Sequence, residues 1–121
     1  MHFTKLLFLI CLTFVSFVSA KEPKYITVFN DDKNTIWYRD DVIAKDGNVS
    51  LIMGVLLKKT AQMGIYNTEY NCASRSWITN SGKMMDRDGS VIYEQKERDL
   101  SWQLVAPNST YERILNTVCR K

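Results

Sequence analysis

The middle of the chain alternates between apolar and polar residues with the period of two that β-strands require. The clearest stretch is GIYNTEYNC at 64–72. One face carries Tyr66, Thr68, Tyr70 and Cys72. The other face carries the amide and carboxylate side chains of Asn67, Glu69 and Asn71. We take the aromatic face to be the core face, which places Cys72 on the side that packs.

Further strands are predicted on both sides of this stretch because short runs rich in β-branched and aromatic residues end at turn signals. They span 24–30, 35–40, 48–59, 74–80 and 90–94. Asp46-Gly47 and Asp88-Gly89 tolerate the backbone angles of tight turns. The polar stretch at 95–101 predicts a loop.

The segment 48–59 is apolar on both faces, which is typical of a central strand or of a strand that contacts another chain. Val49, Leu51, Met53, Val55 and Leu57 share one face, and Ile52 and Leu56 share the other. A buried helix is the competing interpretation, and Gly54 together with the branched residues weakens it.

The end of the chain changes to the period of a helix. Pro107 precedes it, Ser109 can cap it, and Glu112 three residues later completes a capping-box pattern. The apolar stripe of this helix consists of Tyr111, Ile114, Leu115 and Val118, with Cys119 at its end. This stripe needs an apolar surface, and the aromatic face of 64–72 supplies it.

These elements predict one α+β domain, in which an antiparallel β-sheet of about five or six strands packs against a C-terminal α-helix. The first twenty residues read as a processing segment instead. Lys5 precedes an apolar run at 6–18, and Val18-Ser19-Ala20 supplies the small residues of a cleavage site. We expect a signal peptide at 1–20, cleaved after Ala20, and a mature domain at 21–121.

The predicted leader decides the expected location. Its apolar run is shorter than the roughly 20 residues of a membrane span, and no second run of that length follows, so we expect no integral membrane segment. Cys11 follows the bulky Leu9 and Ile10, which is a poor setting for lipid attachment, and no lipobox cysteine starts the mature chain. Export to the periplasm, the outer surface or the medium is expected.

Charge and cysteine count narrow the class further. The chain has 16 Lys and Arg against 13 Asp and Glu, a formal charge of +3, and removal of Lys5 would leave +2. This excess is small and scattered, so we expect no nucleic-acid partner. Loss of the leader removes Cys11 and leaves Cys72 and Cys119, which allow one internal pairing. An exported chain of this size favours a disulfide between them, tying the helix to the sheet.

Several motifs in order resemble the surface-adhesin protein E family. They are the aromatic-x-x-x-Tyr-Asn-Cys stretch at 66–72, Arg75 with an aromatic at 77, Gly89-Ser-Val-Ile at a strand start, Trp102, and PNSTYERILNTVC near the end. WYRDDVI at 37–43 and Gly47-x-Val49 fit the same template. The resemblance covers nearly the whole mature chain.

The resemblance implies an antiparallel sheet packed by a C-terminal helix, joined by a disulfide, in a bacterial envelope protein. The family's named member is a lipoprotein adhesin of the outer surface that captures host matrix and serum proteins. This sequence departs from it in lacking a cysteine at the start of the mature chain.

Catalytic chemistry is not expected. Removal of the leader removes His2, the only histidine, and with it every histidine-based triad or metal site. Asp40 and Asp41 are adjacent, so in a strand they would point to opposite faces, and we interpret them as a strand end. DRDGS at 86–90 lacks the further ligands of a calcium loop and predicts a turn. We predict no enzyme activity and no cofactor or metal.

The candidate protein-contact residues are Trp77, Arg75, Lys58 and Lys59. Trp77 shares a half-polar face with Arg75 and Thr79, whereas we expect Trp102 in the core. Arg75 is interpreted as the partner of Glu69 in a solvated cross-strand pair, with a ligand carboxylate as the alternative. Lys58 and Lys59 form a small basic patch or a solvated strand end.

The leading hypothesis is therefore an exported, non-catalytic binding protein of the bacterial envelope, with host matrix or serum proteins as partners. The alternative is a periplasmic structural or accessory protein without a host ligand, which self-associates as a homodimer through the apolar face of residues 52 and 56.

Overall fold

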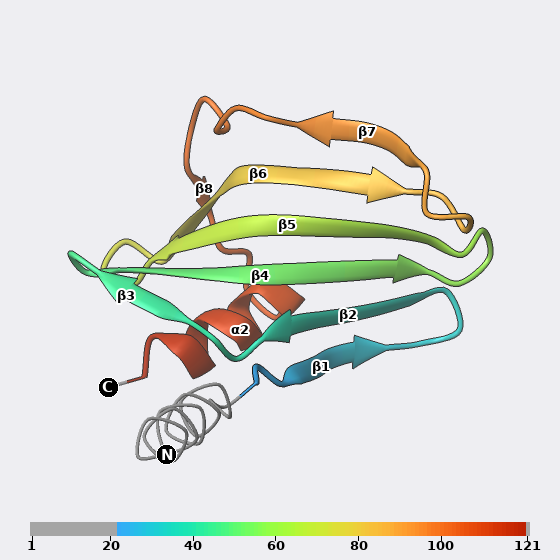
Figure 1. Ribbon diagram of the computed structural model, residues 1–121. Helices are drawn as coiled ribbons and strands as arrows, with labels where there is room; N and C mark the ends of the chain where they lie inside the picture. The colour runs from blue at the N-terminus through green and yellow to red at the C-terminus, as the bar shows by residue number, and fades with distance from the viewer. Residues whose placement is uncertain (1–21, 121) are drawn as a thin grey trace, which may run out of the picture.

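The computed structural model of this protein describes residues 22–120, and within them one antiparallel sheet carries one helix on one face (Figure 1). The strands are β1 (Tyr25–Asn30), β2 (Asn34–Arg39), β3 (Ile43–Lys45), β4 (Asn48–Leu57), β5 (Gln62–Asn71), β6 (Ser76–Met85), β7 (Val91–Gln95) and β8 (Gln103–Leu104), and the helix is α2 (Thr110–Val118). The predicted α+β class with an antiparallel sheet and a C-terminal helix is confirmed. The predicted leader and its cleavage site lie outside the described residues.

The sheet follows the chain in the order β1-β2-β4-β5-β6-β7, and the two shortest strands lie off this path. β3 pairs with the start of β4, and β8 pairs with the start of β6. The sequence analysis missed both because three and two residues are too few to show a period. It also ended the fifth predicted strand at 80, whereas β6 continues to Met85 because β5 provides a pairing partner along its whole length.

The central strand β4 has two different faces, as its pattern predicts. Val49, Leu51 and Met53 are buried on the face that α2 covers, where they lie opposite Tyr70, Thr68 and Tyr66 of β5. Ile52 is half-buried on the opposite face. The central-strand interpretation is therefore confirmed against the competing helix.

The core lies between α2 and this inner face. Tyr70 and Ile114 are fully buried and Leu115 is 1% exposed, and all three belong to one cluster with Tyr38, Leu51 and Met53. The predicted aromatic face of 64–72 is thus the core face. Tyr70 also donates its hydroxyl to the carbonyl oxygen of Tyr111 at 3.2 Å, which joins the sheet to the first turn of the helix.

The start of α2 uses the predicted cap with one difference. Ser109 is the N-cap, and its hydroxyl oxygen accepts the N–H of Glu112 at 3.2 Å. The Glu112 carboxylate reaches back to the N–H of Asn108 at 3.1 Å, one residue earlier than in a standard capping box. Asn108 has φ of 61°, so its backbone turns sharply just before the helix.

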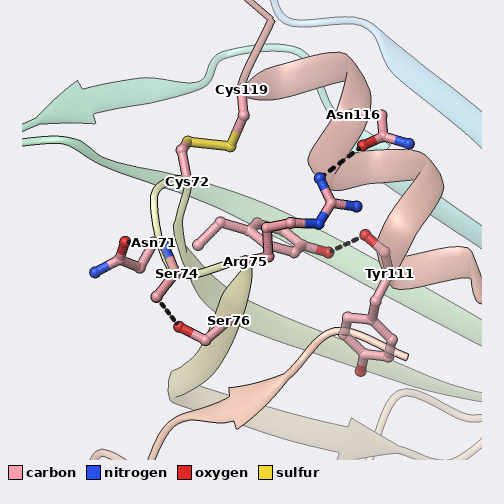
Figure 2. The surroundings of a disulfide bond; sticks show 9 residues. Asn71, Cys72, Ser74, Arg75, Ser76, Tyr111, Asn116 and Cys119 are labelled. Carbon is pink, nitrogen blue, oxygen red and sulfur yellow. Dashed lines mark hydrogen bonds between the residues drawn. A yellow bond between two sulfur atoms is a disulfide. The ribbon is translucent and has the colours of Figure 1, made fainter. Parts of the chain in front are cut away.

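The end of α2 is held by the predicted disulfide (Figure 2). Cys119 is the C-cap residue, and its N–H donates to the carbonyl oxygen of Leu115 at 2.9 Å. Its sulfur bonds to Cys72, directly after β5, with the two Cα atoms 5.6 Å apart. The bond therefore fixes the last turn of a terminal helix, which would otherwise fray.

Removal of the disulfide should destabilise the fold strongly. The cysteines are separated by 47 residues, and closing such a loop stabilises by about 4 kcal/mol in the chain-entropy model. We expect the variant Cys72→Ala/Cys119→Ala to lose about this much free energy of unfolding in urea denaturation. Chemical reduction of the parent protein is the matched control and should give the same loss. A change below about 1 kcal/mol would contradict the prediction.

The tyrosines of the core should make stability fall at high pH. Burial raises the pKa of Tyr70 far above its ordinary value of 10.0, with a smaller contribution from Tyr111. Its stabilising effect is complete below pH 10.0 and is lost as the pH rises above it, because only the unfolded chain then ionises. We expect urea unfolding between pH 8 and pH 11 to show falling stability above about pH 10.

The variant Tyr70→Phe separates this effect from general alkaline unfolding. It retains the ring and loses the group that ionises, so its free energy of unfolding should fall less steeply above about pH 10. At neutral pH this variant should be less stable than the parent, because it lacks the hydrogen bond to Tyr111. Equal slopes for Tyr70→Phe and the parent would refute the assignment.

Candidate functional site

The structure separates the four predicted contact residues into two groups. Trp77 and Arg75 lie at the β5–β6 end of the sheet, whereas Lys58 and Lys59 lie in the turn between β4 and β5. The ten residues of β5 separate these ends, a length of about 30 Å. The four residues therefore form no single surface, and their role in binding stays a prediction.

Trp77 lies on the inner face of β6 and is half-buried. Its ring stacks on that of Tyr111 from α2, with centroids 4.2 Å apart and an interplanar angle of 15°. The polar neighbour expected on its face, Thr79, is 9% exposed. Trp77 thus contributes to helix–sheet packing, and the residue remains partly exposed.

Arg75 does not form the cross-strand pair that the sequence analysis favoured. It lies in the turn between β5 and β6 with φ of 51°, not in a strand. Its guanidinium donates to the Glu112 carboxylate at 3.1 Å and to the Asn116 side chain at 3.3 Å (Figure 2 shows the second bond). A turn residue therefore bonds to α2, a partner that strand alternation does not reveal.

Glu69 instead organises the outer face of the sheet, opposite α2. Its carboxylate accepts bonds from the side chains of Asn48 at 2.6 Å, Asn80 at 3.1 Å and Arg98 at 3.3 Å. The Arg98 guanidinium lies over the Trp102 ring, 5.2 Å from its centroid. This network attaches the loop after β7 to the sheet.

The sequence analysis expected Trp102 in the core, and the structure places it at the surface instead. It is 36% exposed on the segment that leads into β8. The expectation was wrong because the chain at 96–104 runs along the edge of β6 and not beneath the sheet.

That edge presents a row of exposed apolar side chains. β7 and β8 pair with different halves of β6, and β5 occupies the other side of β6, so both short strands lie along one edge. We call this surface the β7–β8 edge; its exposed apolar residues are Val91, Ile92, Tyr93, Leu100, Trp102 and Leu104. β7 is the last strand of the sheet order, so among the described residues no strand pairs with its outer side (Figure 1).

A second apolar surface lies on the outer face over β2, β4 and β5. Trp37, Gly54 and Ile65 stand side by side across these strands, with Ile52 and Leu56 next to them on β4. A Cβ atom at Gly54 would lie 1.9 Å from the Trp37 ring, so the ring packs directly on the glycine backbone. We call these five residues the outer apolar face.

A groove of about 420 Å³ lies beside the end of α2. Its other walls are the segment from the end of β2 into β3 and the start of β4. Its walls include the disulfide, and its lining is mainly apolar.

The basic pair at Lys58 and Lys59 lies in the β4–β5 turn, away from this groove. Lys58 uses its ammonium group to bond to the carbonyl oxygen of Asp31 at 2.6 Å, which closes the β4–β5 turn against β1–β2.

Between residues 22 and 120 there is no cluster of three or more His, Cys, Asp or Glu with metal-binding geometry. In the same range, none of the structure's helices has the length and apolar character to cross a bilayer.

Comparison with known proteins gives one match. A family model described as surface-adhesin protein E matches residues 25–120. The match begins with the first residue of β1 and includes both cysteines of the disulfide. No curated protein and no solved structure shows significant similarity to the chain.

The close contact between Trp37 and Gly54 predicts that replacing this glycine by alanine lowers the stability, whereas the same replacement in a strand usually raises it. In a strand, Gly→Ala should stabilise by about 0.5–1 kcal/mol because alanine has fewer unfolded conformations. Here we expect Gly54→Ala to destabilise by about 1–3 kcal/mol, because the new Cβ displaces the Trp37 ring.

A double-mutant cycle measured by urea unfolding tests this reason. In a Trp37→Ala background the same Gly54→Ala change should be neutral or stabilising. The prediction fails if Gly54→Ala is equally destabilising in both backgrounds.

Proposed function

The chain belongs to the surface-adhesin protein E family, and from this premise we propose that it is an exported, non-catalytic binding protein of the bacterial envelope. Its partner is a protein, of the host matrix or serum class that the resemblance to the family's named member suggests. The signal peptide at 1–20 delivers it across the inner membrane and is cleaved after Ala20.

The observation that carries this proposal is the β7–β8 edge. A free strand edge offers backbone N–H and C=O groups to an incoming extended segment, and natural proteins usually protect such edges with lysine, proline or cover. Val91, Ile92 and Tyr93 are 51%, 53% and 62% exposed, and the charged residue of β7 is Glu94, near the end of the strand. Such a strand suits β-augmentation, in which backbone bonds give affinity and side chains give specificity.

We propose that the occupant is an extended segment of the partner protein, added next to β7. The partner would bury the apolar side chains of β7 on both sides of the extended sheet. Leu100 and Leu104 of the same edge, 105% and 79% exposed, enlarge the surface beyond the five residues of β7.

Self-association is the second candidate function, and the outer apolar face favours it. Trp37, Ile52, Leu56 and Ile65 are half-buried on a face that no described helix covers. Two copies packed through this face would form a homodimer without a host ligand. Exposed apolar patches of this kind often mark protein contacts.

Binding to immobilised fibronectin, collagen and laminin, measured by surface plasmon resonance with the mature protein, tests the first candidate. We expect at least one of these proteins to bind, and the variant Ile92→Lys/Tyr93→Lys to weaken that binding at least tenfold, because a charge on the edge disfavours strand pairing. Ile43→Lys is the matched control, since Ile43 is 66% exposed on a different strand. It should bind as the parent does.

Light scattering of the same variants separates the two candidates. A monomeric parent protein with edge-dependent binding supports the first. A dimer that Leu56→Lys dissociates, together with no matrix binding, would establish the second and refute the first.

Export has its own measurement. We expect the protein purified from the envelope or medium of the native bacterium to begin at Lys21 in N-terminal sequencing, and surface biotinylation to label it on intact cells. Intact residues 1–20 or a purely cytoplasmic protein would contradict the export proposal.

A further inference from the structure

The groove at the end of α2 has the size and the rigidity of a small-molecule site. Its volume of about 420 Å³ falls in the usual range for such sites. The Cys72–Cys119 bond forms part of its wall and fixes the end of α2 against β5. The groove is therefore preformed and needs little ordering on binding.

Its apolar walls come from two neighbouring strands and from the helix at the other end of the described chain. Val42 and Ala44 come from the segment of β3, Val49 from β4, and Val118 from the last turn of α2. These are short aliphatic groups. They suit an aliphatic ligand of similar width.

Two opposite charges also line the groove, and they do not pair with each other. Asp40 and Arg120 are both lining residues, and among residues 22–120 no ion pair joins either of them to another side chain. One Asp40 oxygen accepts the backbone N–H of Lys24 at 2.8 Å, which orients the carboxylate. Its second oxygen accepts no bond from any described residue.

Tyr38 supplies a polar group within the groove. The residue as a whole is 3% exposed. No buried side-chain oxygen or nitrogen of the described residues lacks a hydrogen-bond partner, so the Tyr38 hydroxyl, which bonds to no described residue, reaches the solvent in the groove and is open to a ligand. Burial and, to a smaller extent, the Asp40 carboxylate raise the pKa of Tyr38, so the hydroxyl stays protonated and can donate.

We propose that this groove binds a small zwitterion with aliphatic side chains, of the class of a short aliphatic peptide. The ligand's ammonium group bonds to Asp40, its carboxylate bonds to Arg120, and its side chains pack on Val42, Val49 and Val118. The Tyr38 hydroxyl bonds to a polar atom of the ligand backbone. This site is separate from the β7–β8 edge and does not depend on the proposed adhesin function.

The pair of charges selects this class over simpler amphiphiles. A fatty acid would pair its carboxylate with Arg120 and leave Asp40 without a partner, whereas an alkyl amine would pair with Asp40 and leave Arg120 without one. Both charged residues are exposed, so a neutral apolar molecule would contact the walls and gain nothing from either charge. A zwitterion satisfies both.

Four peptides test the proposal by NMR titration of the ¹⁵N-labelled mature protein. Leucyl-leucine carries all three features, N-acetyl-leucyl-leucine lacks the ammonium, leucyl-leucine amide lacks the carboxylate, and glycyl-glycine lacks the aliphatic groups. We expect leucyl-leucine to shift the amide signals of residues 42–49 and 117–120. Loss of either charge should weaken binding about tenfold or more, as charge-assisted bonds contribute. Glycyl-glycine should cause no shift.

Adjacent residues of β3 offer a matched pair of variants. Ala44 lies opposite Val49 and lines the groove, whereas Ile43 lies opposite Ser50 on the other face. Ala44→Trp should fill the groove and abolish binding of leucyl-leucine, and Ile43→Trp should leave it unchanged. Asp40→Asn keeps an acceptor for the Lys24 N–H and should remove the preference for leucyl-leucine over its N-acetyl form.

The proposal is overturned if leucyl-leucine causes no shift at millimolar concentration, or if the shifts lie away from the groove. Equal binding of all four peptides, or equal loss in Ala44→Trp and Ile43→Trp, would overturn it as well. Unfolding of each variant followed by circular dichroism confirms that the fold is intact. Failure here leaves matrix-protein binding at the β7–β8 edge unaffected, and that binding is measured separately.

Discussion

The contact between α2 and the inner face of the sheet is the constraint on which the rest of the structure depends. A nine-residue helix is too short to be stable alone, so its stability has to come from tertiary contacts. Ile114 and Leu115 bury their side chains against Tyr70, and the disulfide closes the far end. Three interactions hold consecutive turns of this helix: the Tyr70–Tyr111 hydrogen bond at its start, apolar burial in its middle and the disulfide at its end. Each one reduces the conformational freedom of the helix, so the next one costs less entropy to form.

This arrangement divides the surface of the molecule. α2 covers the inner face of the sheet and reaches from the edge strand β1 to Trp77 of β6, and among residues 22–120 no helix covers the opposite face or the β7–β8 edge (Figure 1). The polar network around Glu69 and the packing of Trp37 on Gly54 occupy parts of the outer face. Most of the remaining exposed apolar groups lie at the β7–β8 edge, on the outer apolar face and on β1, where Tyr25 and Ile26 are exposed. A small sheet with one helix has more apolar surface than it can bury, and the excess is what a binding protein can use.

The disulfide at the end of α2 also shapes the groove. If α2 ended freely, its last turn could close over Val42 and Val49 or move away from them. The bond between Cys72 and Cys119 keeps it at one distance, so a cavity persists beside the helix end. The disulfide thus contributes both to the stability of the fold and to the shape of the groove.

The sequence alone determined the elements whose signals are local and repeated. Period-two alternation predicted β4 and β5 with their correct faces, helical spacing predicted α2, and the count of cysteines left one pairing. The ordered motifs predicted the family. These inferences succeed because burial imposes a period on every strand and helix that packs on a core.

Only the tertiary structure decided the rest. β3 and β8 are too short for a period and exist because β4 and β6 offer free edges beside them. Arg75 bonds to Glu112 on α2 and Trp102 lies on an edge, because a turn and a returning loop bring together residues far apart in the chain. The groove joins residues from the end of β2 through β4 to residue 120, so no local pattern contains it. Periodicity reports which side of an element is buried, whereas partners across the fold depend on how the elements are placed, and that placement is set by long-range packing.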